Sequence, residues 1–239
     1  MKLAIHGHNY KASALCGLDR HNRRLNREYG NINIDKARSA DNILLIPPQE
    51  NLYQDAKKRI EEQVIAKGGR VTKVSNWVTE FVIYAPEALT AEQQNNYFQT
   101  VVNYFAEKVG RDNLLSAVVH VDETHSHMHL DFTPIIEHRL SSKRIMTRDF
   151  LIKLHNELPP ILQAQGYDIQ RGDMVKEEDR HLKGRSTRRY KSEIEKEKVE
   201  LLKKCRAEQL IAAELRKGNL ELARKILERS QNIDRSLSL

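Results

Sequence analysis

The window His120–His129 constrains this chain more than any other segment, because it holds four of the ten histidines beside an acidic pair. Imidazole is a costly core filler, and several converging imidazoles are typical of a bound transition metal. In a β-strand alternate residues share a face, so His127 and His129 point to the same side. Met128 and Leu130 point to the other side. One face is therefore predicted to be buried and the other to carry chemistry.

A second strand is predicted at residues 114–120, ending at His120. The short polar segment 122–126 would let the two strands pair as an antiparallel hairpin, with His120 across from His127 or His129. Three imidazoles from adjacent strands make a rigid, open metal site. The alternative is a histidine-rich surface turn that binds metal only adventitiously. His125 lies in the turn and fits a solvated loop residue as well as a ligand.

The remaining pattern predicts an α+β fold, in which a central antiparallel sheet has helices on one face and the imidazoles on the other. Strands are expected at residues 1–5, 43–46 and 76–84, and helices at residues 13–29, 52–66, 90–109 and from 147 onward. Pro159 and Pro160 are expected to kink or interrupt the last of these helices. From residue 190 the composition changes to a charged helix with an apolar stripe, which Gly218-Asn219 would break.

Two domains follow from this pattern: residues 1–189, which carry the metal site, and a charged amphipathic helical tail at 190–239. The net charge is +7, and basic residues cluster near residues 20–27 and 183–191, which suits nucleic-acid phosphates. A solvated basic surface is the alternative. Cys16 and Cys205 match no metal or redox spacing, and no apolar run approaches a membrane span, so we expect a soluble, cytoplasmic protein.

A basic surface beside an open metal site indicates phosphodiester chemistry, because a metal can withdraw charge from a phosphate oxygen. The attacking group is then either water, giving hydrolysis, or a side chain, giving a covalent intermediate.

The spacing His120-x-Asp-Glu-x3-His127-x-His129 resembles the metal motif of the MobV-type plasmid mobilisation relaxases. These are also called Pre or plasmid recombination enzymes and belong to the HUH endonuclease class. The run Arg20-His21-Asn22-Arg23-Arg24, with Asn33, Arg38-Ser39 and Asn42 after it, is similar to the family's N-terminal motif. The segment 151–172 is also similar in character. One departure is that His125-Ser126 stands where the family commonly has Thr-Pro, which leaves the ligand role of His125 open.

The resemblance implies a relaxase fold and an enzyme that nicks and rejoins one strand of plasmid DNA at a transfer origin, staying attached to the 5′ phosphate. His120, His127 and His129 would hold Mn²⁺ or Mg²⁺. His21 would be the nucleophile, and Glu123 would accept its proton or orient it. DNA contacts would come from Arg20, Asn22, Arg24, Arg38, Ser39 and Asn42. Among these, Arg24 would clamp the cleaved phosphate, since guanidinium pairs with two oxygens at once.

Two other functions fit the same residues. One is a rolling-circle replication initiator that attacks through a tyrosine, with Tyr10, Tyr29 and Tyr53 as rival nucleophiles. The other is a DNA-binding protein that does not catalyse a reaction and whose metal is structural. The tail at 190–239 could mediate self-association or contact with transfer machinery, and a helix folded back on the domain is the alternative.

Overall fold

The computed structural model describes residues 1–31, 33–87 and 89–172, and later in the chain residues 208–213, 215–216, 218–222, 224–225 and 227. The chain divides into two compact units, Met1–Met174 and Val175–Leu239. The first unit contains the sheet and the histidine motif. The boundary expected between residues 189 and 190 lies outside the described residues and stays a prediction.

A five-stranded sheet forms the frame of the first unit, in the order β1-β3-β5-β4-β2, and every neighbouring pair is antiparallel. Its strands are β1 (Ile5–Lys11), β2 (Ile43–Ile46), β3 (Asn76–Tyr84), β4 (Leu114–His120) and β5 (His127–Phe132). A two-stranded ribbon follows, made of β6 (Ile135–Ile136) and β7 (Arg139–Leu140). The α+β class with a central antiparallel sheet is confirmed.

The predicted hairpin is present, with His120 opposite His127 and Val118 opposite His129. The apolar side of β5 is fully buried, as its alternation predicts, with Met128, Leu130 and Phe132 all at 0% exposure. Burying a side chain of this size stabilises the fold by about 1.5–3 kcal/mol. The hairpin therefore holds the histidines on a rigid support.

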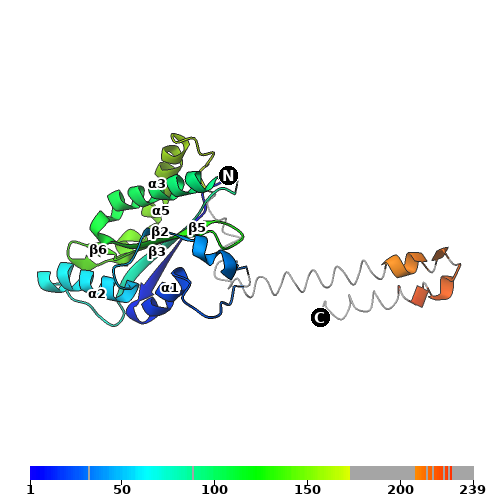
Figure 1. The fold of residues 1–239 in the computed structure, drawn as a ribbon, viewed down its shortest axis with the longest axis horizontal. Coiled ribbons are helices and arrows are strands. Elements are labelled where there is room, and N and C mark those ends of the chain that lie inside the picture. Colours follow the sequence, from blue (N-terminus) through cyan, green and yellow to red (C-terminus); the bar gives the residue numbers. More distant parts are fainter. Residues whose placement is uncertain are drawn as a thin grey trace. The chain divides into compact units, whose positions relative to one another are not determined.

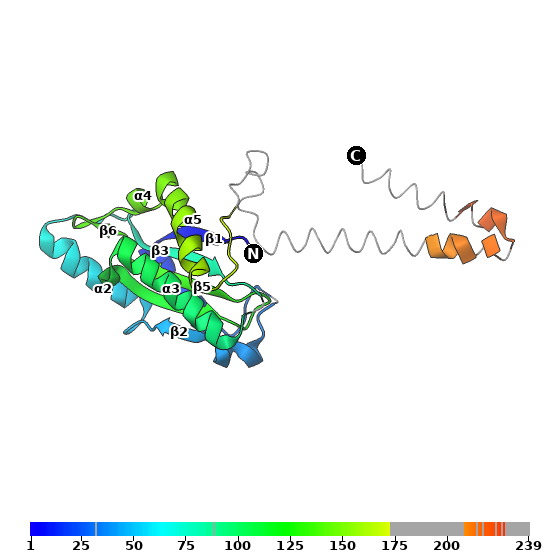
Figure 2. The same cartoon turned by 90° about the horizontal axis from the view of Figure 1, so that it is seen from above.

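Two long helices cover the buried face of the sheet, as Figures 1 and 2 show: α3 (Ala91–Val109) and α5 (Arg148–Gln163). Thr90 caps α3 with a reciprocal capping box to Gln93, and Gly110 ends that helix with φ +88°. A short helix, α4 (Ser142–Ile145), precedes α5. This layer carries most of the apolar core and leaves the histidine face on the other side.

The opposite face is partly covered by α1 (Leu15–Asn22) and α2 (Leu52–Gln63), which lie on the other side of the sheet from α3 (Figure 1). A second apolar cluster joins these helices to the sheet, and its buried members are Leu15, Leu18, Leu52, Ala56, Val78 and Leu115. We expected helices on one face only. The added pair closes one end of the histidine face and brings the end of α1 over the histidines.

Three expected elements differ from the structure. The helix expected at 13–29 ends at Asn22, and Arg24 has φ +57°, because both residues bind partners about a hundred positions away. The strand expected at 1–5 begins only at Ile5. Pro159 and Pro160 lie inside α5, which continues to Gln163. Buried leucines on both sides of the prolines hold that helix to the core.

Three-residue turns of 3₁₀ helix occur at Ala12–Ala14, Ile65–Lys67 and Arg111–Asn113, and a six-residue one at Lys36–Asp41. In the second unit the described residues on both sides of Gly218 are helical, and Gly218 has φ +77°. The expected break at Gly218 is therefore confirmed, while most of the apolar stripe expected along this tail lies outside the described residues. No helix in the described ranges is long and apolar enough to cross a bilayer.

Candidate metal centre and active site

His120, His127 and His129 converge at one end of the sheet, and their ligand atoms lie within 4.8 Å of one another. All three residues are buried. Nδ1 of His120 lies 3.4 Å from Nε2 of His127. Two ring nitrogens at that distance repel each other unless a proton or a cation lies between them. The register of the hairpin produces this convergence, since β4 ends opposite the start of β5.

In each of the three rings, one nitrogen already donates a hydrogen bond to an oxygen atom of the protein. Nε2 of His120 donates to the backbone carbonyl of Asn22 over 2.7 Å. Nδ1 of His127 donates to the carbonyl of His125 over 2.9 Å. Nδ1 of His129 donates to Oε1 of Glu80 over 2.6 Å. These bonds fix each tautomer and leave Nδ1 of His120 and Nε2 of the other two rings as lone pairs for a metal.

The donor set fits a divalent transition metal. Nε2 of His129 is a buried polar atom without a hydrogen-bond partner among the described residues. An unpaired buried nitrogen is costly, and a metal ion would satisfy it. Three neutral imidazoles leave coordination positions open for a substrate oxygen.

Glu80 is the centre of a buried network behind the three histidines. Besides the bond to His129, its carboxylate accepts from the hydroxyl of Tyr10 at 2.9 Å and from Nδ2 of Asn22 at 3.4 Å. Burial opposes its ionisation, but these donors hold the pKa of Glu80 below its usual range. The pKa of the neighbouring Asp131 is raised well above its usual range, because that carboxyl is fully buried and lies beside Glu80.

Asn22 joins α1 to this network. Its Nδ2 donates to Asp131 over 3.0 Å, and its carbonyl accepts from His120. The side chain is buried, with 2% of the residue exposed. The Nδ2 group of Asn22 is thus bound inside the protein, while its Oδ1 is buried without a hydrogen-bond partner among the described residues. The expected DNA contact of Asn22 stays a prediction, and the contacts present here join α1 to the three histidines.

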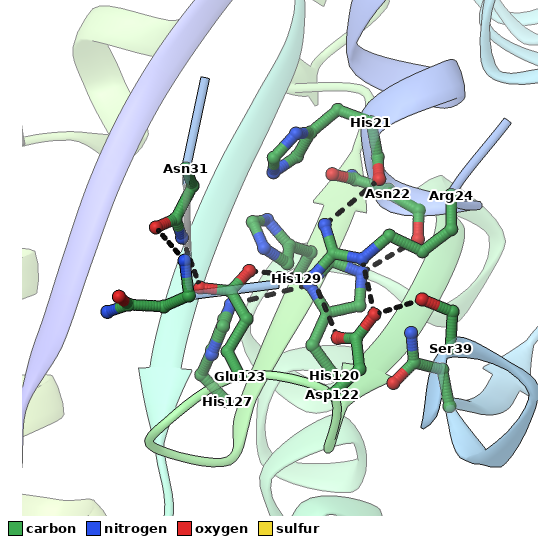
Figure 3. A network of polar contacts seen from close by, with 12 residues as sticks. His21, Asn22, Arg24, Asn31, Ser39, His120, Asp122, Glu123, His127 and His129 are labelled. Atoms are coloured by element: carbon green, nitrogen blue, oxygen red, sulfur yellow. Dashed lines mark hydrogen bonds and ion pairs between the residues drawn. The ribbon is translucent and has the colours of Figure 1, made fainter. Parts of the chain in front are cut away.

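His21 precedes Asn22, and Figure 3 shows its ring directed toward the three imidazoles. Its ring centroid lies 5.7 Å from that of His129 and 6.0 Å from that of His120. Burial, together with smaller electrostatic contributions from the neighbouring His129 and Arg24, lowers the pKa of His21 to about 4. The ring is therefore neutral at pH 7, which is the form that carries a nucleophilic lone pair.

Arg24 connects the site to the turn after β4 (Figure 3). Its Nε and Nη2 donate to the two carboxylate oxygens of Asp122, both over 2.9 Å, and Nη2 also donates to Glu123 over 2.6 Å. Only 5% of the Arg24 side chain is exposed. Ser39 adds a 2.6 Å hydrogen bond to Asp122, and together these donors hold the pKa of Asp122 below its usual range despite its burial. This network fixes the turn between the two histidine strands.

Glu123 accepts from Arg24 through one oxygen and from Nδ2 of Asn31 through the other, the latter over 2.6 Å. Its negative charge raises the pKa of His21, although burial of the ring outweighs this effect. Glu123 is thus close enough for its negative charge to stabilise the protonated form of His21.

The sequence model of a family described as plasmid recombination enzyme matches residues 1–192 of this chain. The chain belongs to this family. A plasmid recombination enzyme of Bacillus thuringiensis is 32% identical over 174 residues, which cover 71% of this chain and 39% of that protein. One of Lactiplantibacillus plantarum is 35% identical over 173 residues, covering 70% of this chain and 48% of that protein. The chain thus spans less than half the length of these curated relatives.

The fold is similar to solved structures of the MobM relaxase domain bound to oriT DNA of plasmid pMV158, with manganese present. One, at pH 5.5, has a TM-score of 0.71 and 27% identity, covering 80% of this chain and 99% of that domain. Another, at pH 6.8, has a TM-score of 0.72 and 27% identity, covering 80% and 98%. The expected relaxase-type fold is therefore confirmed, and in both structures the MobM domain is bound to manganese and DNA.

The resemblance to plasmid recombination enzymes also predicted DNA contacts at four further residues, of which two are exposed and two are bound to the hairpin turn. Arg20 and Arg38 are exposed and free to meet solvent or a ligand. Ser39 and Asn42 instead hold the hairpin turn, Ser39 through Asp122 and Asn42 by accepting from the backbone N–H of Val121 over 2.8 Å. Of these four residues, only Arg20 and Arg38 have the exposure that a direct contact with DNA requires.

The structure also gives the positions of His125 and of the three tyrosines considered as alternative nucleophiles. Nδ1 of the exposed His125 ring lies 3.1 Å from Oε1 of Glu87, and His125 is absent from the clusters that could hold a metal in the described part of the chain. Tyr53 stacks on Trp77, and Tyr10 is bound to Glu80. Tyr29 alone among the three lies beside His21, with ring centroids 6.2 Å apart.

Sequence reasoning missed Glu80 and treated Asn31 only as part of a polar loop. A signal for Glu80 was present, since it is the one acidic residue in the strand Asn76–Tyr84, which is otherwise largely aromatic and β-branched. A carboxylate at the centre of such a strand needs a buried partner. No comparable signal exists for Asn31, because loop geometry alone brings it to Glu123.

Proposed function

We propose that this chain nicks one strand of plasmid DNA at a transfer origin and rejoins it, through a covalent bond between His21 and the 5′ phosphate. The observation that carries the proposal is the position of His21. Its neutral ring lies beside three imidazoles that each keep one ring nitrogen for a metal. The MobM domain, which is similar in fold, binds manganese and oriT DNA.

His120, His127 and His129 would hold the metal, and Mn²⁺ is the ion we propose first because the MobM structures contain it. Such an ion, when bound, supplies Lewis-acid charge that stabilises the negative phosphate oxygens during attack. The protein would hold three imidazole nitrogens in fixed positions for the ion. Because these residues are buried, other ligands have little access to the site.

In the proposed reaction a ring nitrogen of His21 attacks phosphorus, an N–P bond forms, and the P–O3′ bond breaks. The departing 3′ oxygen takes up a proton and becomes a hydroxyl. Rejoining is the reverse, in which the 3′ hydroxyl attacks phosphorus and the N–P bond breaks. Glu123 stabilises the positive charge that develops on the imidazole, as its effect on the pKa of His21 indicates.

Arg24 has a supporting part in this proposal. Because its guanidinium is committed to Asp122 and Glu123, we assign it the positioning of the carboxylates rather than a clamp on the cleaved phosphate. Exposed Arg20 and Arg38 are proposed as phosphate contacts. Residues 1–189 are proposed as the catalytic unit, acting in the cytoplasm, and a role of the tail in self-association or in contact with transfer machinery remains a proposal.

The proposal is tested by incubating the full chain with Mn²⁺ and supercoiled plasmid that carries its own transfer origin. We expect strand nicking by the wild type and none by His21→Ala, His127→Ala or His129→Ala. The three variants should keep most of their DNA affinity, because phosphate contacts dominate binding. His125→Ala is the matched control, since that ring faces Glu87, and it should nick normally.

A tyrosine mechanism is the second candidate, favoured by the place of Tyr29 beside His21. A tyrosine mechanism predicts that Tyr29→Phe loses nicking and that His21→Ala keeps it. Tight DNA binding without nicking under any metal condition would instead support a DNA-binding protein with a structural metal.

A further inference from the structure

The edge strand β1 carries exposed rings on the same face of the sheet as the metal centre. His6 pairs with Val82 in antiparallel register, and paired residues point to the same face. Val82 pairs on its other side with His129. His6 therefore lies two strands away from a metal-binding imidazole, about 10 Å across the sheet. His8 follows on the same face, about 6.7 Å further along the strand.

Tyr84 links these rings to the metal centre. Its ring centroid lies 5.3 Å from that of His127 and 6.1 Å from that of His6. His6 and His8 are exposed, while Tyr84 and Val82 are half-buried. Helices α1 and α2 pack against the other end of this face, and His6 and His8 are exposed beside the half-buried, apolar Val82.

We propose that His6, His8 and Tyr84, together called the aromatic strip, stack against unpaired bases of the DNA strand next to the phosphate that His21 attacks. The inference rests on the proposed function, because it needs a single strand at the metal centre. Exposed rings beside a backbone-binding site are how many proteins hold single-stranded DNA, since every base has a stacking face. The strip would thus direct the strand across β3 toward the metal ligands.

A second metal site is the main rival explanation for two histidines at alternate positions. Among the described residues, the clusters that could hold a metal consist of His120 with His127 and His129, or of His120 with Asp122 and Glu123. Neither His6 nor His8 belongs to them. Direct phosphate contact by a charged imidazole is the other rival, and it differs from stacking in its dependence on bases and on salt.

The experiment compares two oligonucleotides with identical phosphates, oligo-dT and an abasic analogue, by fluorescence anisotropy with the full chain at pH 8. We expect the wild type to prefer oligo-dT. His6→Ala/His8→Ala should lose roughly 5-fold or more of its affinity for oligo-dT, the low end of the range for stacking. Its affinity for the abasic strand and the salt dependence of binding should not change.

Two further variants make the outcome decisive. His6→Phe/His8→Phe keeps aromatic rings but removes the nitrogens that could bind a phosphate or a metal, so it should retain the preference for oligo-dT. His138→Ala removes an exposed imidazole at the turn between β6 and β7, which follows the far end of β5, and should behave as wild type. The inference is overturned if the alanine pair keeps the full base preference, or if the phenylalanine pair loses it. Failure of the wild type to nick its origin would instead contradict the proposed function itself.

Discussion

The backbone carbonyl of Asn22 accepts a hydrogen bond from Nε2 of His120 over 2.7 Å. Because Asn22 directly follows His21, this bond joins the last turn of α1 to an imidazole of the proposed metal site. The side-chain amide of Asn22 adds hydrogen bonds to Asp131 and Glu80 on the two central strands. Asn22 is therefore one of the residues that set the distance between the proposed nucleophile and the three imidazoles.

Asn22→Ala is expected to lower the rate of strand cleavage at least 10-fold with little change in DNA affinity. The substitution keeps the carbonyl but leaves two buried carboxyl groups without their amide donor, which should also cost about 1–3 kcal/mol of stability. Single-turnover cleavage and denaturant unfolding measure the two effects. Asn103→Ala, on the exposed side of α3, is the control and should leave both unchanged. Cleavage at the wild-type rate by Asn22→Ala would show that α1 is positioned by other contacts.

Glu80→Gln is expected to weaken Mn²⁺ binding by about 10- to 100-fold, because the carboxylate orients His129 and increases its basicity. Isothermal titration of the metal-free protein with Mn²⁺ gives the affinity directly. Glu87→Gln is the matched substitution at an exposed carboxylate and should bind as the wild type does. Equal Mn²⁺ affinity in both variants would mean that the bond between Glu80 and His129 has no effect on the metal.

Arg24→Ala should destabilise the protein by about 3 kcal/mol or more, since it leaves the carboxylate of Asp122 buried without its ion-pair partner. Most of that loss should disappear in the double variant Arg24→Ala/Asp122→Ala, which removes both charges. Denaturant unfolding of the four proteins of the cycle measures the coupling. If Arg24→Ala instead has normal stability and a large loss of DNA affinity, Arg24 binds the cleaved phosphate, as the family resemblance implies.

The metal-free protein is expected to lose stability as pH falls from about 6.5 toward 4. Burial lowers the pKa of His21 to about 4, and it also lowers the pKa of His120 and of His127. The unfolded chain therefore binds more protons than the folded one in this window, and unfolding becomes easier with each proton taken up.

The effect is at most about 1–2 kcal/mol for each ring between pH 7 and 5. Thermal unfolding in the presence of a chelator, repeated across this pH range, measures it. His21→Gln should show a shallower loss than the wild type, because one such ring is gone. His138→Ala, which removes an exposed ring, should follow the wild type. Parallel curves for His21→Gln and the wild type would contradict a neutral, partly buried His21.

The convergence of the three histidines was predictable from sequence because a strand repeats every two residues, which fixes which histidines share a face. The hairpin register could be narrowed only to His127 or His129, since its turn has no characteristic type. The end of α1 was not predictable. The helical pattern continues to Tyr29, and the helix stops at Asn22 because contacts with distant residues compensate for the lost backbone bonds.

The supporting residues were harder still to predict. Glu80 and Asn22 act through partners on other strands, and no local pattern identifies those partners. Asn22 and Ser39 look like DNA contacts in a basic, polar segment, but the folded chain turns their side chains inward. Residue type predicted the chemistry of this region, whereas tertiary packing decided which groups remain available to a ligand.

The most direct measurement is to map the residue that becomes attached to DNA. The full chain is incubated with Mn²⁺ and a single-stranded oligonucleotide that carries its origin, then digested and analysed by mass spectrometry. We expect a nucleotide remnant on the peptide that contains His21, stable to alkali and lost in acid, as is typical of an N–P bond. A remnant on Tyr29 that survives acid, or cleavage without any attached nucleotide, would contradict it.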